Sequence, residues 1–146
     1  MPVSTSAIGK TYAPTTYVVG REKVKEYANA VGETNPVYLD PEAAKAAGYS
    51  DVVAPPMFAV VYKAPSMVPP LFDPEVGINF ALMVHGAQEF TWGAPVVAGD
   101  EITTTASVKD VSERNGMGFF VFQSTSVNQR GETVCVGEWT NIVRGV

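Results

Sequence analysis

The sequence predicts a single α+β domain in which an antiparallel sheet wraps around a central apolar helix. Helical patterns occupy the first half of the chain, and strand patterns separated by tight turns occupy the second half. One segment, residues 57–63, is apolar on nearly every side. Helices followed by sequential strands indicate an antiparallel sheet, and an apolar helix must be buried, so wrapping the sheet around this helix buries both.

The composition fits one domain over residues 1–146. With 46% hydrophobic and 17% charged residues, a chain of this length buries roughly 70% of its unfolded surface without disulfides or metal. The net charge of −5 and the scattered Lys and Arg residues argue against nucleic acid or an anionic membrane as a partner, because both require a concentrated basic surface. No apolar run is long enough for a membrane span, and the N-terminus lacks a signal-peptide pattern.

The chain has one cysteine, Cys135, and one histidine, His85. Neither an internal disulfide nor a Cys/His zinc site can be assembled from them. We therefore expect a buried, reduced thiol, a cytoplasmic protein, and no metal or other cofactor.

A short strand is predicted around residues 12–19, and a helix follows over residues 21–31. This helix is indicated by apolar residues at positions i, i+3, i+4 and i+7, namely Val24, Tyr27, Ala28 and Val31. Gly32 is a natural end for it.

A second helix has clear boundaries. Asp40 is a candidate N-cap, Pro41 suits the first helical position, and Glu42 suits the positive end of the helix dipole. Gly48 ends the helix after an alanine-rich stretch.

Pro55 and Pro56 precede the apolar segment 57–63, which is predicted to be a helix buried all round. Prolines then recur up to residue 74 and predict an irregular loop over residues 65–78.

Strand patterns begin near Met83 and continue over residues 102–111, 119–127 and 133–143. Turn dipeptides separate the later strands, at Gly99-Asp100, Asn115-Gly116 and Arg130-Gly131. A sheet of this kind around a central helix is the hot-dog architecture, which is the predicted fold.

Three motifs carry a family resemblance. Residues 30–40 read Ala-Val-Gly-Glu-Thr-Asn-Pro-Val-Tyr-Leu-Asp and resemble the Gly-Asp-x-Asn-Pro-x-His signature of MaoC-like (R)-specific enoyl-thioester hydratases and dehydratases. Residues 53–58 resemble the family's Ile-Ala-His-Gly-Met-Leu turn into the central helix, and residues 95–102 look like its Pro-Val-x-x-Gly-Asp-x-Ile strand entry. More narrowly, the chain is similar to small actinobacterial (3R)-hydroxyacyl-ACP dehydratase subunits related to the N-terminal half of fatty-acid-synthase dehydratases, in which one hot-dog chain pairs with a second, catalytic chain.

The family chemistry uses one carboxylate and one imidazole to move water, with a backbone N–H polarising the thioester carbonyl. The resemblance places Glu33 and Tyr38 at the two catalytic positions. Glu33 is either a displaced catalytic carboxylate or a solvated surface group. Tyr38 is either a proton donor or a tyrosine packed over the helices, because a phenol is a poor base at neutral pH. Pro56 replaces the glycine whose N–H would serve the oxyanion, and proline has no N–H.

The resemblance also implies a set of substrate-binding residues. Asn35 is expected to tie down the motif turn, and the N–H of Met57 could stand in for the missing donor. His85 would line the thioester tunnel, contact a partner chain, or be a structural histidine. The predicted substrate-binding set is Asn35, Pro56, Met57, Phe58, His85 and Gly86.

Three functions remain open at this point. The first is a dehydratase subunit that supplies tunnel wall and stability to a second hot-dog chain with an intact motif, acting on acyl-CoA or acyl-ACP thioesters. The second is a self-sufficient homodimeric (R)-specific enoyl-CoA hydratase that uses Glu33 and Tyr38. The third is a non-enzymatic acyl-thioester-binding protein. All three imply a homodimer or heterodimer, because pairing two hot-dog sheets covers an otherwise open edge strand.

Overall fold

The computed structural model describes residues 2–146 and confirms the predicted fold class. Five antiparallel strands form one sheet in the order β1-β3-β4-β5-β2. The strands are β1 (Thr15–Val18), β2 (Met83–Trp92), β3 (Glu101–Arg114), β4 (Met117–Val127) and β5 (Thr133–Arg144). The helices are α1 (Arg21–Ala30), α2 (Pro41–Ala46) and α3 (Ala59–Phe72), with short 3₁₀ turns η1 (Pro36–Tyr38), η2 (Pro56–Phe58) and η3 (Phe80–Leu82).

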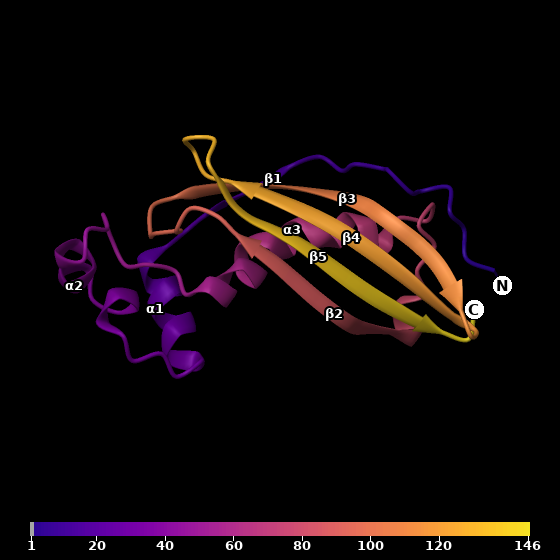
Figure 1. The fold of residues 1–146 in the computed structure, drawn as a ribbon, viewed down its shortest axis with the longest axis horizontal. Coiled ribbons are helices and arrows are strands. Elements are labelled where there is room, and N and C mark those ends of the chain that lie inside the picture. The colour runs from indigo at the N-terminus through magenta and orange to yellow at the C-terminus, as the bar shows by residue number, and fades with distance from the viewer. Residues whose placement is uncertain (1) are drawn as a thin grey trace.

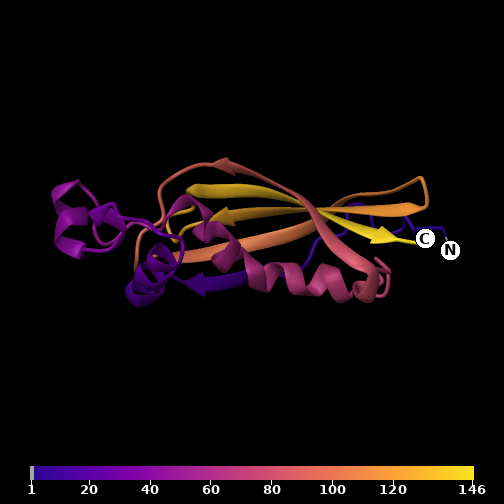
Figure 2. The same ribbon diagram turned by 90° about the horizontal axis from the view of Figure 1, so that it is seen from below.

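The long helix α3 lies along one face of the curved sheet, while α1 and α2 stand beyond one end of it (Figures 1 and 2). The helix packs chiefly on β1, β3 and β4. The same face of β5 and β2 therefore has much less helix over it, and the outer edge of β2 has no strand paired with it among residues 2–146. The candidate functional site lies at this half of the sheet.

The two N-terminal helices form where local signals predict them. Asp40 accepts a hydrogen bond from the N–H of Glu42 at 3.0 Å, and Pro41 occupies the first turn of α2. The predicted apolar face of α1 is narrower than expected, since Val24 and Ala28 are buried but Val31 is 55% exposed. Val31 is the C-cap of the helix, where the helical conformation ends.

The loop predicted for residues 65–78 is wrong over its first half. Helix α3 runs on to Phe72 and contains Pro65, Pro69 and Pro70. Each proline removes one backbone hydrogen bond, but Met67 and Pro70 are buried against the rest of the fold. We attribute the continued helix to this burial, which outweighs the local preference of proline.

The prediction that segment 57–63 is a helix buried all round also needs correction. The segment begins with the 3₁₀ turn η2, and Met57 within it is 48% exposed. The helix is covered by the sheet on one side only, so its opposite side is left open.

The hairpin between β3 and β4 follows the predicted Asn-Gly turn. Asn115 has φ 53° and Gly116 has φ 69°, the left-handed conformations that a tight two-residue hairpin requires. The adjacent register pairs Arg114 with Met117, so this turn fixes which residues of β3 and β4 face α3.

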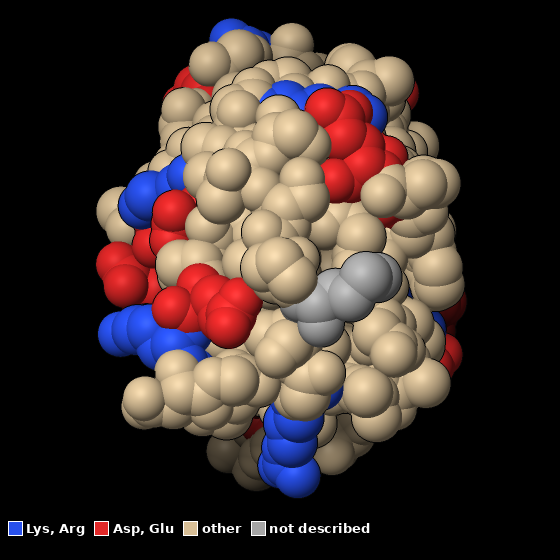
Figure 3. Space-filling model, turned by 90° about the vertical axis from the view of Figure 1, so that its right-hand side faces the viewer, with Lys and Arg blue, Asp and Glu red and all other residues tan. Residues whose placement is uncertain are grey.

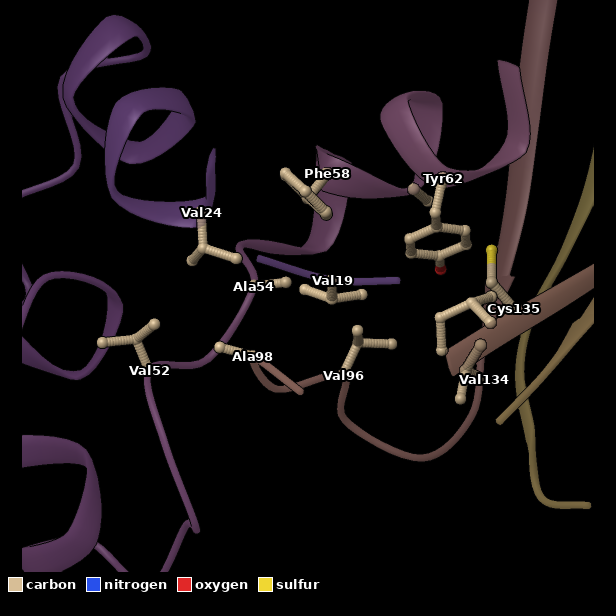
Figure 4. Close-up of a cluster of buried hydrophobic side chains, with 12 residues drawn as sticks. Val19, Val24, Val52, Ala54, Phe58, Tyr62, Val96, Ala98, Val134 and Cys135 are labelled. Carbon is tan, nitrogen blue, oxygen red and sulfur yellow. The ribbon is translucent and has the colours of Figure 1, made fainter. Parts of the chain in front are cut away.

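The buried apolar residues form two separate clusters. The first lies near η2 and the start of α3, around Phe58, Tyr62 and Val134 (Figure 4). The second lies further along α3, around Met67 and Phe122. The buried side chains between the two clusters are polar.

Candidate functional site

A pocket of about 200 Å³ lies where the start of α3 meets the end of β2. Its walls come from Tyr38 of η1, residues 53–56, Tyr62 of α3, residues 92–96 and Val134 of β5. Most of this lining is apolar, with aromatic rings contributed by Tyr38, Tyr62 and Trp92. Such a pocket suits an apolar ligand held by a few polar groups.

Two of the predicted site residues meet in this pocket. Tyr38 and Pro56 both line it, although they lie far apart in the sequence. A backbone hydrogen bond from the N–H of Val53 to the carbonyl of Val37, 2.9 Å long, joins the two segments. The bond fixes the motif turn beside the turn into α3.

The motif turn itself is built by Asn35. Its side-chain oxygen accepts from the N–H of Val37 at 3.1 Å and caps the 3₁₀ turn that carries Tyr38. Glu33 is held only through its backbone, whose N–H donates to the carbonyl of Ala28 at 2.9 Å. The Glu33 side chain is half-buried and is not part of the pocket lining.

The remaining predicted binding residues are spread around the pocket rather than in it. Phe58 is fully buried in the first core cluster, where its ring packs edge-on against Tyr27 with 5.4 Å between the ring centroids. Met57 is half exposed beside it. Whether either contacts a substrate stays a prediction.

His85 and Gly86 lie on β2, further along the sheet. The His85 ring packs edge-on against Trp139, with 5.9 Å between the ring centroids. Gly86 is the extra residue of a β-bulge between His85 and Ala87. A Cβ built on Gly86 would lie 2.5 Å from Cδ1 of Ile142, so the Ile142 side chain occupies the space over Gly86.

An aromatic stripe connects this strand to the pocket. Along β2 and β5, the ring centroids of Trp92 and Phe90 are 5.1 Å apart, and those of Phe90 and Trp139 are 6.0 Å apart. Trp139 in turn packs against His85. Trp92 at the pocket end is 47% exposed. Sequence reasoning did not place Trp92 in the site, although its position at the end of an edge strand next to a Gly-Ala-Pro turn was a usable signal.

Tyr62 is a second residue that sequence reasoning missed. It is 3% exposed, it lines the pocket, and its hydroxyl points toward Val96 and Val134, which also line it (Figure 4). Burial raises the pKa of Tyr62 far above its usual value. The phenol therefore stays protonated and offers a hydrogen-bond donor at the floor of the pocket.

Lys63, the next residue, is fully buried between α3 and the sheet. Its ammonium donates to the hydroxyl of Ser126 at 2.8 Å and to the carbonyls of Cys135 at 3.1 Å and Ser124 at 3.2 Å. These bonds use all three of its donors. Burial lowers the pKa of Lys63 to about 8.

The residues around Lys63 form a polar layer across the core, comprising Lys63 and Ser66 of α3, Thr104 of β3, and Ser124 and Ser126 of β4. Thr104 and Ser126 share a 2.7 Å hydrogen bond. The layer was detectable in sequence, since Ala59, Lys63, Ser66 and Pro70 have the spacing of one helix face. In the sequence Lys63 stands among apolar residues, so this polar face of the helix was not predicted.

Gly93 provides a test of the pocket wall. A Cβ on Gly93 would lie 2.1 Å from the backbone carbonyl oxygen of Thr133, a contact that only backbone movement can relieve. Gly93→Ala is expected to lower the free energy of unfolding by about 1–3 kcal/mol and to weaken ligand binding in the pocket. Gly20→Ala is the matched control, because nothing lies within 4 Å of its added Cβ. Equal urea midpoints for the two variants would contradict this account of the wall.

Within residues 2–146, no three His, Cys, Asp or Glu residues are grouped so that they could hold a metal ion. No helix in the same range is long and apolar enough to cross a membrane. On the end of the molecule that carries the termini, acidic and basic side chains are interspersed (Figure 3).

The fold and the pocket define a hot-dog protein of the MaoC-like dehydratase and hydratase class. Residues 6–136 match the family described as "FAS1-like, dehydratase domain region". The chain belongs to this family, as the motif resemblance predicted.

The relatives and solved structures agree with this assignment. A "UPF0336 protein" of Clavibacter michiganensis is 47% identical over 99% of this chain and 98% of its own length, and one of Saccharopolyspora erythraea is 42% identical over 99% and 94%. The structure of the C-terminally truncated HadBC (3R-hydroxyacyl-ACP dehydratase) complex from Mycobacterium tuberculosis has a chain 29% identical, with a TM-score of 0.83 and coverage of 94% of this chain and 98% of that one. The R-hydratase PhaJ1 from Pseudomonas aeruginosa, 18% identical with a TM-score of 0.72 over 95% of this chain and 83% of its own, shares the fold.

Proposed function

We propose that this chain is a substrate-binding and stabilising subunit of a (3R)-hydroxyacyl-thioester dehydratase, paired with a second hot-dog chain that carries the catalytic carboxylate and imidazole. The observation that carries this proposal is a well-formed apolar pocket whose catalytic positions are changed. Pro56 lines the pocket at the place where the family has a backbone donor. Tyr38 lines it where the family has its histidine.

The position of Glu33 supports the same proposal. Its side chain has no hydrogen-bonding partner in the part of the chain that the structure describes, and it does not line the pocket with Tyr38. A general base must lie within hydrogen-bond reach of the proton that it moves, directly or through one water. The chain thus keeps the shape of the site without an assembled acid–base pair.

The open half of the sheet supports a partner chain. The outer edge of β2 carries unpaired backbone groups, a feature that proteins usually cover. The Oε1 atom of Gln88 on this strand is buried without a hydrogen-bonding partner within residues 2–146. Large apolar side chains are exposed nearby on α3, η3 and β2, namely Val68, Phe72, Phe80, Leu82, Val84 and Trp92. The similarity to a chain of the HadBC complex favours a second hot-dog chain as the occupant.

The substrate follows from the pocket and from the relatives together. An acyl tail suits the apolar lining, and the HadBC complex is a (3R)-hydroxyacyl-ACP dehydratase. The same pocket would accept the acyl tail of a coenzyme A thioester. We place the protein in the cytoplasm, because its one cysteine, Cys135, is a free, buried thiol.

Activity measurements test the proposal. The purified chain alone is expected to hydrate crotonyl-CoA roughly 10²–10⁴-fold more slowly than its complex with a hot-dog chain that carries the intact motif, because this is what general acid–base catalysis contributes. The partner to co-express is a hot-dog chain that carries the intact Gly-Asp-x-Asn-Pro-x-His motif.

Two outcomes would overturn the proposal. In one, the chain alone is as active as the complex, and Glu33→Gln abolishes this activity while the exposed control Glu22→Gln does not, which would favour the self-sufficient hydratase. In the other, the chain binds acyl thioesters but no combination of subunits turns them over, which would favour a binding protein without catalysis.

A further inference from the structure

We propose that the polar layer centred on Lys63 is a chain-length stop, which limits the acyl tail that enters the pocket to about eight carbons. This inference rests on the proposed function, because it assumes that the pocket receives an acyl tail. It names the residues that set the length of that tail, which no family motif encodes.

The polar layer lies close to the floor of the pocket. Tyr62 and Val134 form part of the pocket lining, and both belong to the first core cluster. The Lys63 ammonium lies 5.9 Å from the centroid of the Tyr62 ring, and it donates to the carbonyl of Cys135, the residue after Val134. The polar layer therefore lies directly behind the floor of the pocket.

The polar layer crosses the space between α3 and strands β3 and β4. Along β3 the inward residues run Ile102, Thr104 and Ala106, from the first apolar cluster through the layer to the second. Along α3 the same change occurs from Tyr62 through Lys63 to Met67. Two elements thus change from apolar to polar to apolar at one level of the core.

On β4 the inward residues change from apolar to polar at the same level. Ser124 and Ser126 lie at the inward positions that follow Phe122 of the second cluster. The hydroxyl of Ser126 bonds both the Lys63 ammonium and Thr104, so α3, β3 and β4 are joined by consecutive hydrogen bonds. Ser66 adds a 2.7 Å bond from its hydroxyl to the carbonyl of Lys63.

Passing this polar layer is energetically costly for an acyl tail. A tail that continued between α3 and the sheet would have to separate the Lys63 ammonium from its acceptors. A buried charge that loses its hydrogen bonds is strongly disfavoured, whereas a methylene group gains only a small amount from the move. The tail therefore stops at Tyr62.

The pocket volume sets the length. A cavity of about 150 Å³ holds benzene, which has six carbons. At the same packing, the pocket of about 200 Å³ holds roughly eight carbons.

The test is the affinity of the full chain for saturated acyl-CoAs of four, six, eight, ten and twelve carbons, measured by isothermal titration calorimetry. Burial of one methylene tightens binding about fourfold. Affinity is expected to rise by about this factor per carbon up to roughly eight carbons, and then to change less than about twofold for each further pair.

Lys63→Met removes the charge and keeps an unbranched side chain. In this variant the rise is expected to continue to twelve carbons, and dodecanoyl-CoA should bind at least about tenfold more tightly than to the wild type. Lys23→Met is the matched control, since the Lys23 side chain is 48% exposed on α1. The affinity of this variant should stop rising at the same acyl chain length as that of the wild type.

The wild-type series decides the matter even if Lys63→Met fails to fold. Affinity that keeps rising through twelve carbons overturns the stop and indicates that the tail leaves over the aromatic stripe of β2. Absence of binding at every chain length overturns the proposed function together with this inference. Binding with a break near eight carbons, moved by Lys63→Met and not by Lys23→Met, supports both.

Discussion

Phe58→Ala is expected to lower the free energy of unfolding by about 3–5 kcal/mol, the usual cost of truncating a buried phenylalanine. Phe58 is fully buried where η2 joins α3. Its ring contacts Tyr27 at 5.4 Å, and Tyr17 and Tyr62 at 6.3 Å each. Aromatic pairs of this geometry add to the stabilisation from burial alone. Urea denaturation followed by circular dichroism measures the effect.

The consequence for function is local as well as global. Pro56 lies in the same turn as Phe58, and Tyr62 lies one helical turn further on. Both line the pocket, so the cavity left by Phe58→Ala should loosen two of its walls and weaken acyl binding. Phe58→Leu is the control, with an expected loss below about 1.5 kcal/mol because it keeps most of the volume. Equal losses of unfolding free energy for the two variants would show that the aromatic contacts, and not the filled volume, stabilise the connection between η2 and α3.

The elements that the sequence predicted well are those with local causes. Asp40 and Pro41 begin α2 through contacts within one turn. The Asn115-Gly116 hairpin depends on the backbone conformation of two residues. The alternation along β3 and β4 also has a simple cause, since one face of each of these strands packs on α3.

The elements that the sequence did not predict depend on distant partners. The prolines of α3 signal a loop locally, and only burial against the sheet keeps that segment helical. Lys63 reads as an ordinary charged residue until three acceptors from β4 and β5 surround it. In the site, the sequence motifs predict Tyr38 and Pro56, whereas Tyr62 and Trp92 belong to the pocket through tertiary packing alone.

The buried lysine and its neighbours also predict how stability depends on pH. Burial lowers the pKa of Lys63 to about 8 from the ordinary 10.5. Between these values the unfolded chain binds more protons than the folded chain, so stability rises with pH. From pH 8 to 9.5 the gain due to Lys63 is about 1.5 kcal/mol.

Cys135 and Tyr62, which lie next to Lys63, act in the opposite direction. Burial raises the pKa of the Cys135 thiol above 9.0 and that of the Tyr62 phenol above 10.0. The folded chain keeps these protons when the unfolded chain has lost them, so both groups lower stability as pH rises past those values. In the wild type, the rise due to Lys63 is therefore partly cancelled from pH 9 upward.

Two variants separate the opposing contributions, and urea midpoints between pH 8 and 9.5 measure them. Cys135→Ala removes the opposing thiol, so its stability should rise more steeply with pH than that of the wild type. Lys63→Met removes the lysine, so its stability should fall over the same range because the thiol then acts alone. If the Cys135→Ala profile were flat or falling, the Lys63 ammonium would have to be stabilised by its three acceptors as fully as it is by water, and its pKa could not be lowered by burial.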